Sequence, residues 1–222
     1  MMIVETFIEN ILKTDFSENY QSVYDNSPLL QYLDKKMKAV HGNSKARRSL
    51  GSIYAIYSIL HFYQKDFFKK PGKYRQFEGY DYMLLFNHCR NLYGGGKLQN
   101  HALNSRVNSE FKNLCKTVSN DLIIVNNGKY MLHIDYLYVK KMDISRTCCR
   151  IIEKYIELLR TKDLALSRLL HEIQILKNDN EKKMRILELL TEDSEARIFE
   201  IICFAILKNH YKNISLSTKI YG

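Results

Sequence analysis

The sequence has few residues that interrupt regular structure, since only 2 of its 222 residues are proline and 9 are glycine. It lacks tryptophan, and no uninterrupted apolar stretch approaches the ~20 residues that a membrane-spanning helix needs. The N-terminal apolar repeat contains Glu5 and Glu9, which is not typical of a signal peptide. Because helix-forming Leu, Ile, Lys and Glu are abundant, we predict a mainly α-helical chain that stays in the cytoplasm and has no membrane partner.

The sequence also lacks a recognisable catalytic centre. Its 5 cysteines form no CxxC pair and its 7 histidines form no HxxxH motif, so we expect reduced thiols and no metal site. Acid-x-Lys triplets, which a magnesium-dependent nuclease carries on a β-strand, occur at 34–36 and 181–183 in helical or loop contexts. In these contexts we interpret the triplets as solvent-exposed charged residues. The sequence of this chain alone therefore predicts no cofactor.

Positive charge is abundant and concentrated in one region. The formal net charge is +10, and between Lys35 and Arg75 Asp66 is the only acid among eleven Lys and Arg residues. Aromatic residues are interleaved with these bases. The pattern fits a surface that contacts phosphates, with Arg47, Arg48, Lys70 and Lys73 as candidates, and it also fits a solvated basic surface over an aromatic core.

An amphipathic helix followed by a β-hairpin is the most informative pattern. Apolar residues repeat at helical spacing at Leu103, Val107, Phe111 and Leu114. Two β-prone runs, 122–125 and 130–134, flank an Asn-Gly turn at 127–128, which is a strong hairpin signal. Helix followed by hairpin is the order of the recognition helix and wing in winged-helix DNA-binding proteins.

The polar residues of this segment match the chemistry of DNA recognition. Asn and Arg side chains fit the adenine and guanine edges, and Lys neutralises phosphates. The candidate DNA-binding residues in and around the helix and hairpin are Lys97, Asn100, His101, Asn104, Arg106, Asn108, Lys112 and Lys129. Among them, we expect Asn100, Asn104, Arg106 and Asn108 near base edges or the backbone, and the lysines on phosphates.

Elsewhere the pattern predicts further helices and two domains. Helices are expected at residues 3–13, 28–41, 50–67, 82–92, 143–159, 164–176, 183–190 and 193–210, with a flexible basic connection at 42–49. Residues 1–140 then form a helical, winged-helix-like DNA-recognition domain with a small β-hairpin. Residues 141–222 form a C-terminal helical segment.

Two stretches resemble a known family. Residues 97–111 (KLQNHALNSRVNSEF) are similar to part of the DNA-recognition region of bacterial type II restriction endonucleases, and residues 194–211 resemble the helix that opens their nuclease domain. The resemblance implies a helical specificity region before a PD-(D/E)XK core that uses Mg²⁺, with Glu195 or Glu200 at the acidic position. The metal-binding strands that should follow are missing, so it implies a truncated or split endonuclease that is inactive alone.

The partner expected from these observations is double-stranded DNA, together with a second copy of the chain or a separately encoded catalytic half. Two other readings remain open: a winged-helix transcriptional regulator, and a basic helical module that binds an acidic protein. An intact enzyme of unrecognised chemistry is a further alternative.

Overall fold

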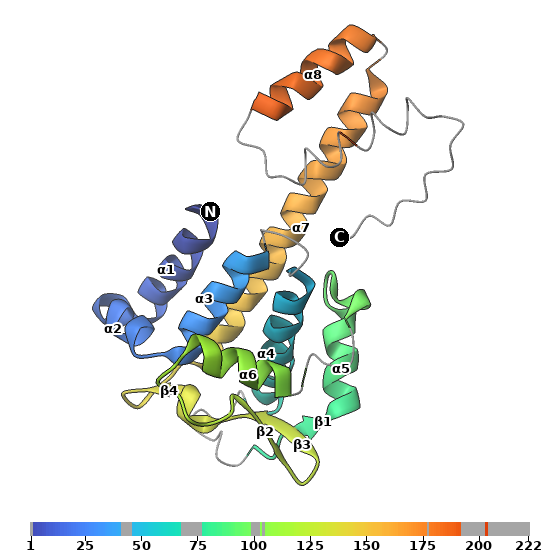
Figure 1. The fold of residues 1–222 in the computed structure, drawn as a ribbon. Coiled ribbons are helices and arrows are strands. Elements are labelled where there is room, and N and C mark those ends of the chain that lie inside the picture. Colours follow the sequence, from blue (N-terminus) through green and yellow to red (C-terminus); the bar gives the residue numbers. More distant parts are fainter. Residues whose placement is uncertain are drawn as a thin grey trace. The chain divides into compact units, whose positions relative to one another are not determined.

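A computed structural model describes residues 2–40, 46–67, 77–98, 103, 105–176, 178–191 and 203. As the sequence predicts, these residues are mainly helical with a small antiparallel sheet (Figure 1). The chain divides into two compact units, Met1–Leu158 and Leu159–Gly222. The division falls later than the domain boundary predicted at 140, because Ile144, Ile151 and Tyr155 are buried within the first unit.

Most of the described helices overlap predicted ones and differ at their ends, whereas α2 was not predicted. They are α1 (Met2–Phe16), α2 (Tyr20–Asp25), α3 (Pro28–Val40), α4 (Ala46–Phe67), α5 (Tyr82–Asn91), α6 (Ser105–Leu114), α7 (Ser145–Ile175) and α8 (Asp179–Thr191). Short 3-10 helices are η1 (Ser17–Asn19), η3 (Gly95–Lys97) and η5 (Ile134–Tyr136). Helix α3 begins as predicted, with the Ser27 hydroxyl accepting a hydrogen bond from the Leu30 amide at 3.2 Å.

Two expectations about helix ends are wrong. Residues 46–49, predicted as part of a flexible connection, form the first turn of α4, and they contain neither glycine nor proline. The helices predicted at 143–159 and 164–176 are one continuous helix, α7, since nothing between them breaks a helix.

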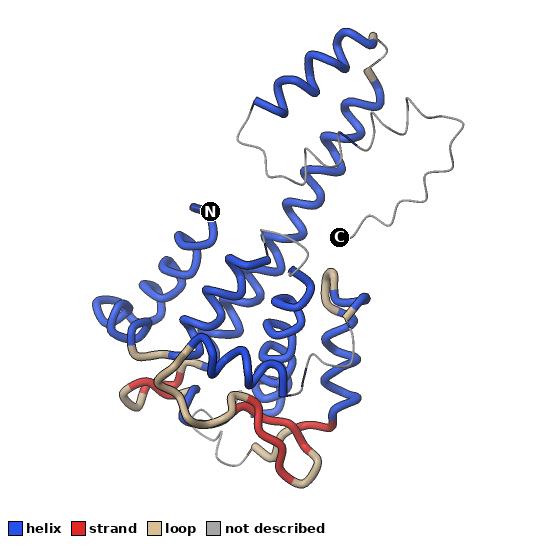
Figure 2. Tube along the Cα trace, viewed as in Figure 1, coloured by secondary structure: helices blue, strands red, loops and turns tan. Residues whose placement is uncertain are grey.

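Helix α4 forms the centre of the first unit. Every residue from 50 to 60 is buried, and α3 packs beside it (Figure 2). Helix α7 is joined to α3 by the Tyr155 hydroxyl, which donates to the Met37 carbonyl at 3.2 Å. Four free cysteines are buried within the first unit: Cys89, Cys115, Cys148 and Cys149. The apolar face of α6 packs against this helical layer, where the Phe111 ring contacts the Tyr32 ring of α3.

The three-stranded sheet has the order β1-β3-β2, with β1 (Tyr80–Asp81), β2 (Ile123–Asn126) and β3 (Lys129–Leu132). All pairings are antiparallel, and the register joins Tyr80 to Tyr130 and Ile123 to Leu132. The Asn-Gly turn forms as predicted, with φ of 49° at Asn127 and 76° at Gly128. A second small hairpin, β4 (Tyr138–Val139) and β5 (Met142–Asp143), was not predicted.

The second unit contains the C-terminal part of α7 and helix α8. The predicted break near Asn178 is present, and the Asn178 carboxamide oxygen accepts from the Asn180 amide at 2.9 Å. Helix α8 begins at Asp179, earlier than the predicted Lys183. The helix predicted at 193–210 lies outside the described residues apart from Cys203. Among the residues placed in the structure, no helix combines the length and apolarity needed to cross a bilayer.

Candidate nucleic-acid interface

Helix α6 packs with the predicted apolar stripe toward the core. Leu103, Val107 and Phe111 are buried, and Leu114 is partly buried. The Phe111 ring makes edge contacts with Tyr32 of α3, at 5.4 Å between centroids, and with Tyr136 of η5, at 4.8 Å. These aromatic contacts on both sides fix how α6 is rotated about its axis.

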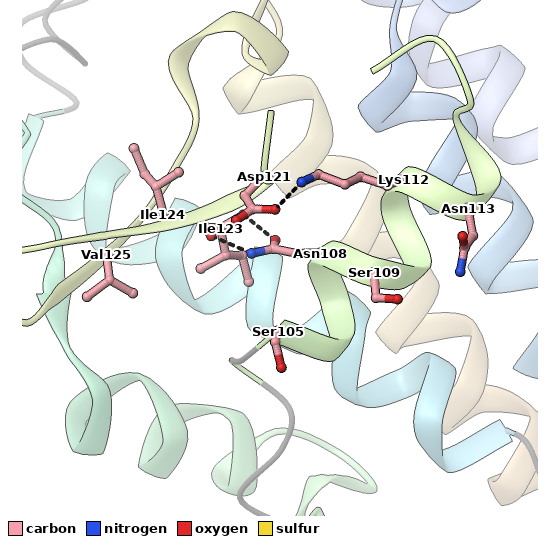
Figure 3. Close-up of a pocket in the computed structure, with 9 residues that line it drawn as sticks. All are labelled: Ser105, Asn108, Ser109, Lys112, Asn113, Asp121, Ile123, Ile124 and Val125. Atoms are coloured by element: carbon pink, nitrogen blue, oxygen red, sulfur yellow. Dashed lines mark hydrogen bonds and ion pairs between the residues drawn. The ribbon is translucent and has the colours of Figure 1, made fainter. Parts of the chain in front are cut away.

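The carboxamide of Asn108 joins α6 to the hairpin (Figure 3). Its nitrogen donates to the Ile123 carbonyl at 2.7 Å, and its oxygen accepts from the Ile123 amide at 2.8 Å. Both backbone groups of Ile123 on this side of β2 are thereby satisfied. Asn108 was predicted near base edges or the DNA backbone, but this geometry gives its side chain a structural role.

Glu110 fastens α6 to the helical layer. Its carboxylate accepts from Lys36 of α3 at 2.6 Å and from the Ser52 hydroxyl of α4 at 3.2 Å. It also accepts from Arg106 Nε, one turn earlier on α6, at 3.1 Å. Burial alone would raise the pKa of Glu110, but the hydrogen bonds and charges of Lys36 and Arg106 outweigh it and lower that pKa below its usual value. Arg106 therefore lies on the flank of α6, beside Glu110.

Of the polar residues on the outward face of α6, only Lys112 was among those predicted to contact DNA. Ser105, Ser109 and Asn113 are exposed on the helix, and Lys112 is partly exposed. Lys116 is exposed too, in the turn that follows α6. At about 100° per residue, Ser105 and Ser109 lie roughly opposite Val107, while Arg106 and Asn108 lie on either flank. The helical spacing already indicated these exposed positions, but Ser105, Ser109 and Asn113 were not among the residues predicted to contact DNA.

A groove of about 760 Å³ runs between α6 and β2. Its lining residues are Ser105, Asn108, Ser109, Lys112, Asn113, Asp121, Ile123, Ile124 and Val125 (Figure 3). The α6 side offers hydroxyl, carboxamide and ammonium groups, whereas β2 offers aliphatic side chains. Lys112 Nζ lies 2.7 Å from the Asp121 carboxylate across this groove. The groove therefore has one polar wall and one apolar wall.

The hairpin projects beyond the helices (Figure 1). Its tip residues Asn126 and Asn127 are exposed, and Lys129 Nζ lies 3.5 Å from the exposed carboxylate of Glu78. Beside it, Gly79 has a φ of 83°, and a Cβ there would lie 2.6 Å from the Tyr130 carbonyl oxygen. Glycine at this position lets β1 approach β3 closely.

Several predicted site residues have no described side chain. Lys97 lies in η3, and Arg47 and Arg48 lie in the first turn of α4, but only their backbone is described. The candidates outside the described residues are Asn100, His101, Asn104, Lys70, Lys73, Glu195 and Glu200.

A second polar cluster joins α4 to α5. His88 Nδ1 lies 2.8 Å from the Ser58 hydroxyl, which lies 3.1 Å from the Cys89 thiol. The rings of His61 and His88 stack with centroids 4.6 Å apart. Burial, and secondarily the neighbouring His61, lowers the pKa of His88 to about 4. Since Ser58 and Cys89 are fully buried, this cluster stabilises packing and offers no accessible nucleophile.

Comparison with known proteins gives no match among protein-family models, curated proteins or solved structures. Within the described ranges, no three His, Cys, Asp or Glu side chains are grouped so that they could hold a metal ion.

Proposed function

We propose that this protein binds double-stranded DNA through α6 and the β2–β3 hairpin. The observation that carries the proposal is the element order β1-α5-α6-β2-β3 combined with the sheet order β1-β3-β2. This is the arrangement of winged-helix units, in which the second of two consecutive helices enters the major groove and the hairpin contacts DNA beside it. Helix-turn-helix proteins place their recognition helix in the same way.

The outward face of α6 supports this proposal chemically. The helix has 10 residues and is therefore about 15 Å long, which suits a major groove about 12 Å wide. Ser105 and Ser109 are small enough to allow close approach and can bond phosphates, while Asn113 matches the adenine edge. A net charge of +10 adds attraction to the phosphate backbone.

A binding titration tests the proposal. The purified chain is titrated into a fluorescent random-sequence duplex at 50 and 200 mM salt, and anisotropy is measured. We expect binding that weakens with salt, because phosphate contacts release counterions. Lys116→Ala should weaken binding to all duplexes and reduce the salt slope by about 0.9, since one phosphate contact is lost. Lys13→Ala on α1 is the control and should change neither value. If the anisotropy shows no binding of the chain to duplex DNA at 50 mM salt, the proposal is refuted.

The resemblance of residues 97–111 to restriction endonucleases supports a more specific form of this proposal. In that version this chain supplies recognition, and a separate catalytic part with Mg²⁺ supplies cleavage. Adding Mg²⁺ to the purified chain and unmethylated DNA should then leave the DNA uncut. Robust cutting would exclude the split-enzyme version while leaving DNA binding intact. A footprint with two inverted half-sites would instead favour a dimeric regulator.

A further inference from the structure

One acid, Asp121, is among the residues that line the groove between α6 and β2. Asp121 precedes β2 and faces Lys112 across the groove, with Oδ1 2.7 Å from Nζ (Figure 3). The side chains are 48% and 41% exposed respectively, so water and a ligand phosphate can both reach the pair. Lys112 is therefore the positively charged side chain among the groove's lining residues, and Asp121 forms an ion pair with it.

The backbone holds Asp121 at this place. Leu122, the next residue, is fully buried, and Ile123 is bonded through both backbone groups to Asn108. On the other side, the Tyr136 hydroxyl donates to the Asn120 carbonyl at 2.8 Å. With both neighbours held, the backbone of Asp121 stays at the groove, so its carboxylate remains close to any phosphate that binds Lys112.

We propose that Asp121 is a selectivity residue of the DNA site, because it limits affinity for the phosphate backbone. This inference rests on the proposed function. A phosphate can displace Asp121 from Lys112, since exposed ion pairs are weak. The displaced carboxylate stays within one Debye length of the phosphate and opposes it. Because Lys112 and Asp121 together carry no net charge, the contact between Lys112 and a phosphate adds little sequence-independent affinity. Binding then depends more on base contacts by the exposed face of α6.

Asp121→Asn tests the inference. Removing the carboxylate leaves Lys112 with an uncompensated charge, which can neutralise one phosphate and release its counterion. The salt slope for a random duplex should become steeper by about 0.9, and the Kd at 50 mM salt should fall about three- to tenfold. In the double variant Lys112→Ala/Asp121→Asn neither position carries a charge. The salt slope for a random duplex should therefore return to the wild-type value.

Glu18→Gln is the matched control, because Glu18 is exposed on η1 outside the groove and the variant gains the same net charge. Equal slopes and Kd values in Asp121→Asn and wild type would overturn the inference while leaving DNA binding standing. Equal effects of Glu18→Gln and Asp121→Asn would also overturn it, since net charge alone would then explain the result. Absence of duplex binding by both wild type and Asp121→Asn would refute the proposed function itself. Circular dichroism of each variant verifies that the fold is retained.

Discussion

Asn108 binds Ile123 as a neighbouring strand would, donating to its carbonyl at 2.7 Å and accepting from its amide at 2.8 Å. One side chain of α6 thus extends the hydrogen bonding of β2 beyond the sheet. The helix and the hairpin are held together by this contact, so the geometry of the proposed DNA site depends on it.

Asn108→Ala should lower the free energy of unfolding by about 2 kcal/mol, because two part-buried backbone groups lose their partners. Urea unfolding followed by circular dichroism measures the change. Ser109→Ala, one residue along and exposed, is the control and should stay within about 0.5 kcal/mol of wild type. Similar losses in the two variants would show that the Asn108 carboxamide contributes no more than a surface side chain.

Gly79→Ala should destabilise the protein more than Gly128→Ala. Both positions have positive φ, which costs a non-glycine residue about 1–2 kcal/mol. Only at Gly79 would the new Cβ meet backbone, 2.6 Å from the Tyr130 oxygen, whereas space around Gly128 is open. Thermal unfolding should therefore show an extra loss of roughly 1–3 kcal/mol for Gly79→Ala. Equal losses would mean that β1 does not need its close approach to β3.

Stability should fall as the pH drops from about 6.5 toward 4, in part because of His88. The folded state holds the pKa of His88 at about 4, below the unfolded value of 6.5, so the unfolded state takes up the proton first. This contribution is complete above pH 6.5 and is lost as the pH falls toward the folded pKa. His88→Asn should flatten the dependence measured by urea midpoints, while His171→Asn on the exposed surface of α7 should preserve it. An unchanged profile in His88→Asn would contradict this assignment.

Asn113→Ala should weaken base discrimination more than overall affinity. If its carboxamide reads a base edge, selection from randomised duplexes should lose one preferred base, with about 1–3 kcal/mol of discrimination removed. Affinity for random duplex should change little. Arg106→Ala is the comparison, since the sequence predicts Arg106 near base edges or the DNA backbone and the structure places it beside Glu110. A greater loss of discrimination in Arg106→Ala would favour the original assignment.

Periodicity and turn chemistry were sufficient to predict the helix and hairpin of the proposed site. The spacing of Val107 and Phe111 predicts a helix because one stripe must be buried, and Asn127-Gly128 predicts the turn because both residues tolerate positive φ. Strand β1 could not be predicted in this way. It has only two residues, and its pairing depends on contact with a strand about fifty residues later in the chain.

The roles of the polar residues on α6 were harder to predict than the helix itself. Asn108 and Arg106 have suitable chemistry for DNA, but a structural partner engages each of them: the Ile123 backbone for one and Glu110 for the other. Sequence gives the residue type and its angle on the helix. It does not reveal that Lys36 and Ser52, distant in the chain, converge on Glu110 and set which face of α6 remains exposed.

The reactivity of the buried cysteines can be used to measure transient unfolding of the first unit. Burial raises the pKa of Cys89 to about 11 and also raises that of Cys115, so little reactive thiolate exists at neutral pH. Cys148 and Cys149 are shielded in the same way, whereas Cys203 is partly exposed. A thiol reagent should therefore modify Cys203 rapidly and the other four only during transient unfolding. The labelling rate of these four thiols then measures how often the interior is exposed, and no cysteine has to be introduced by mutation.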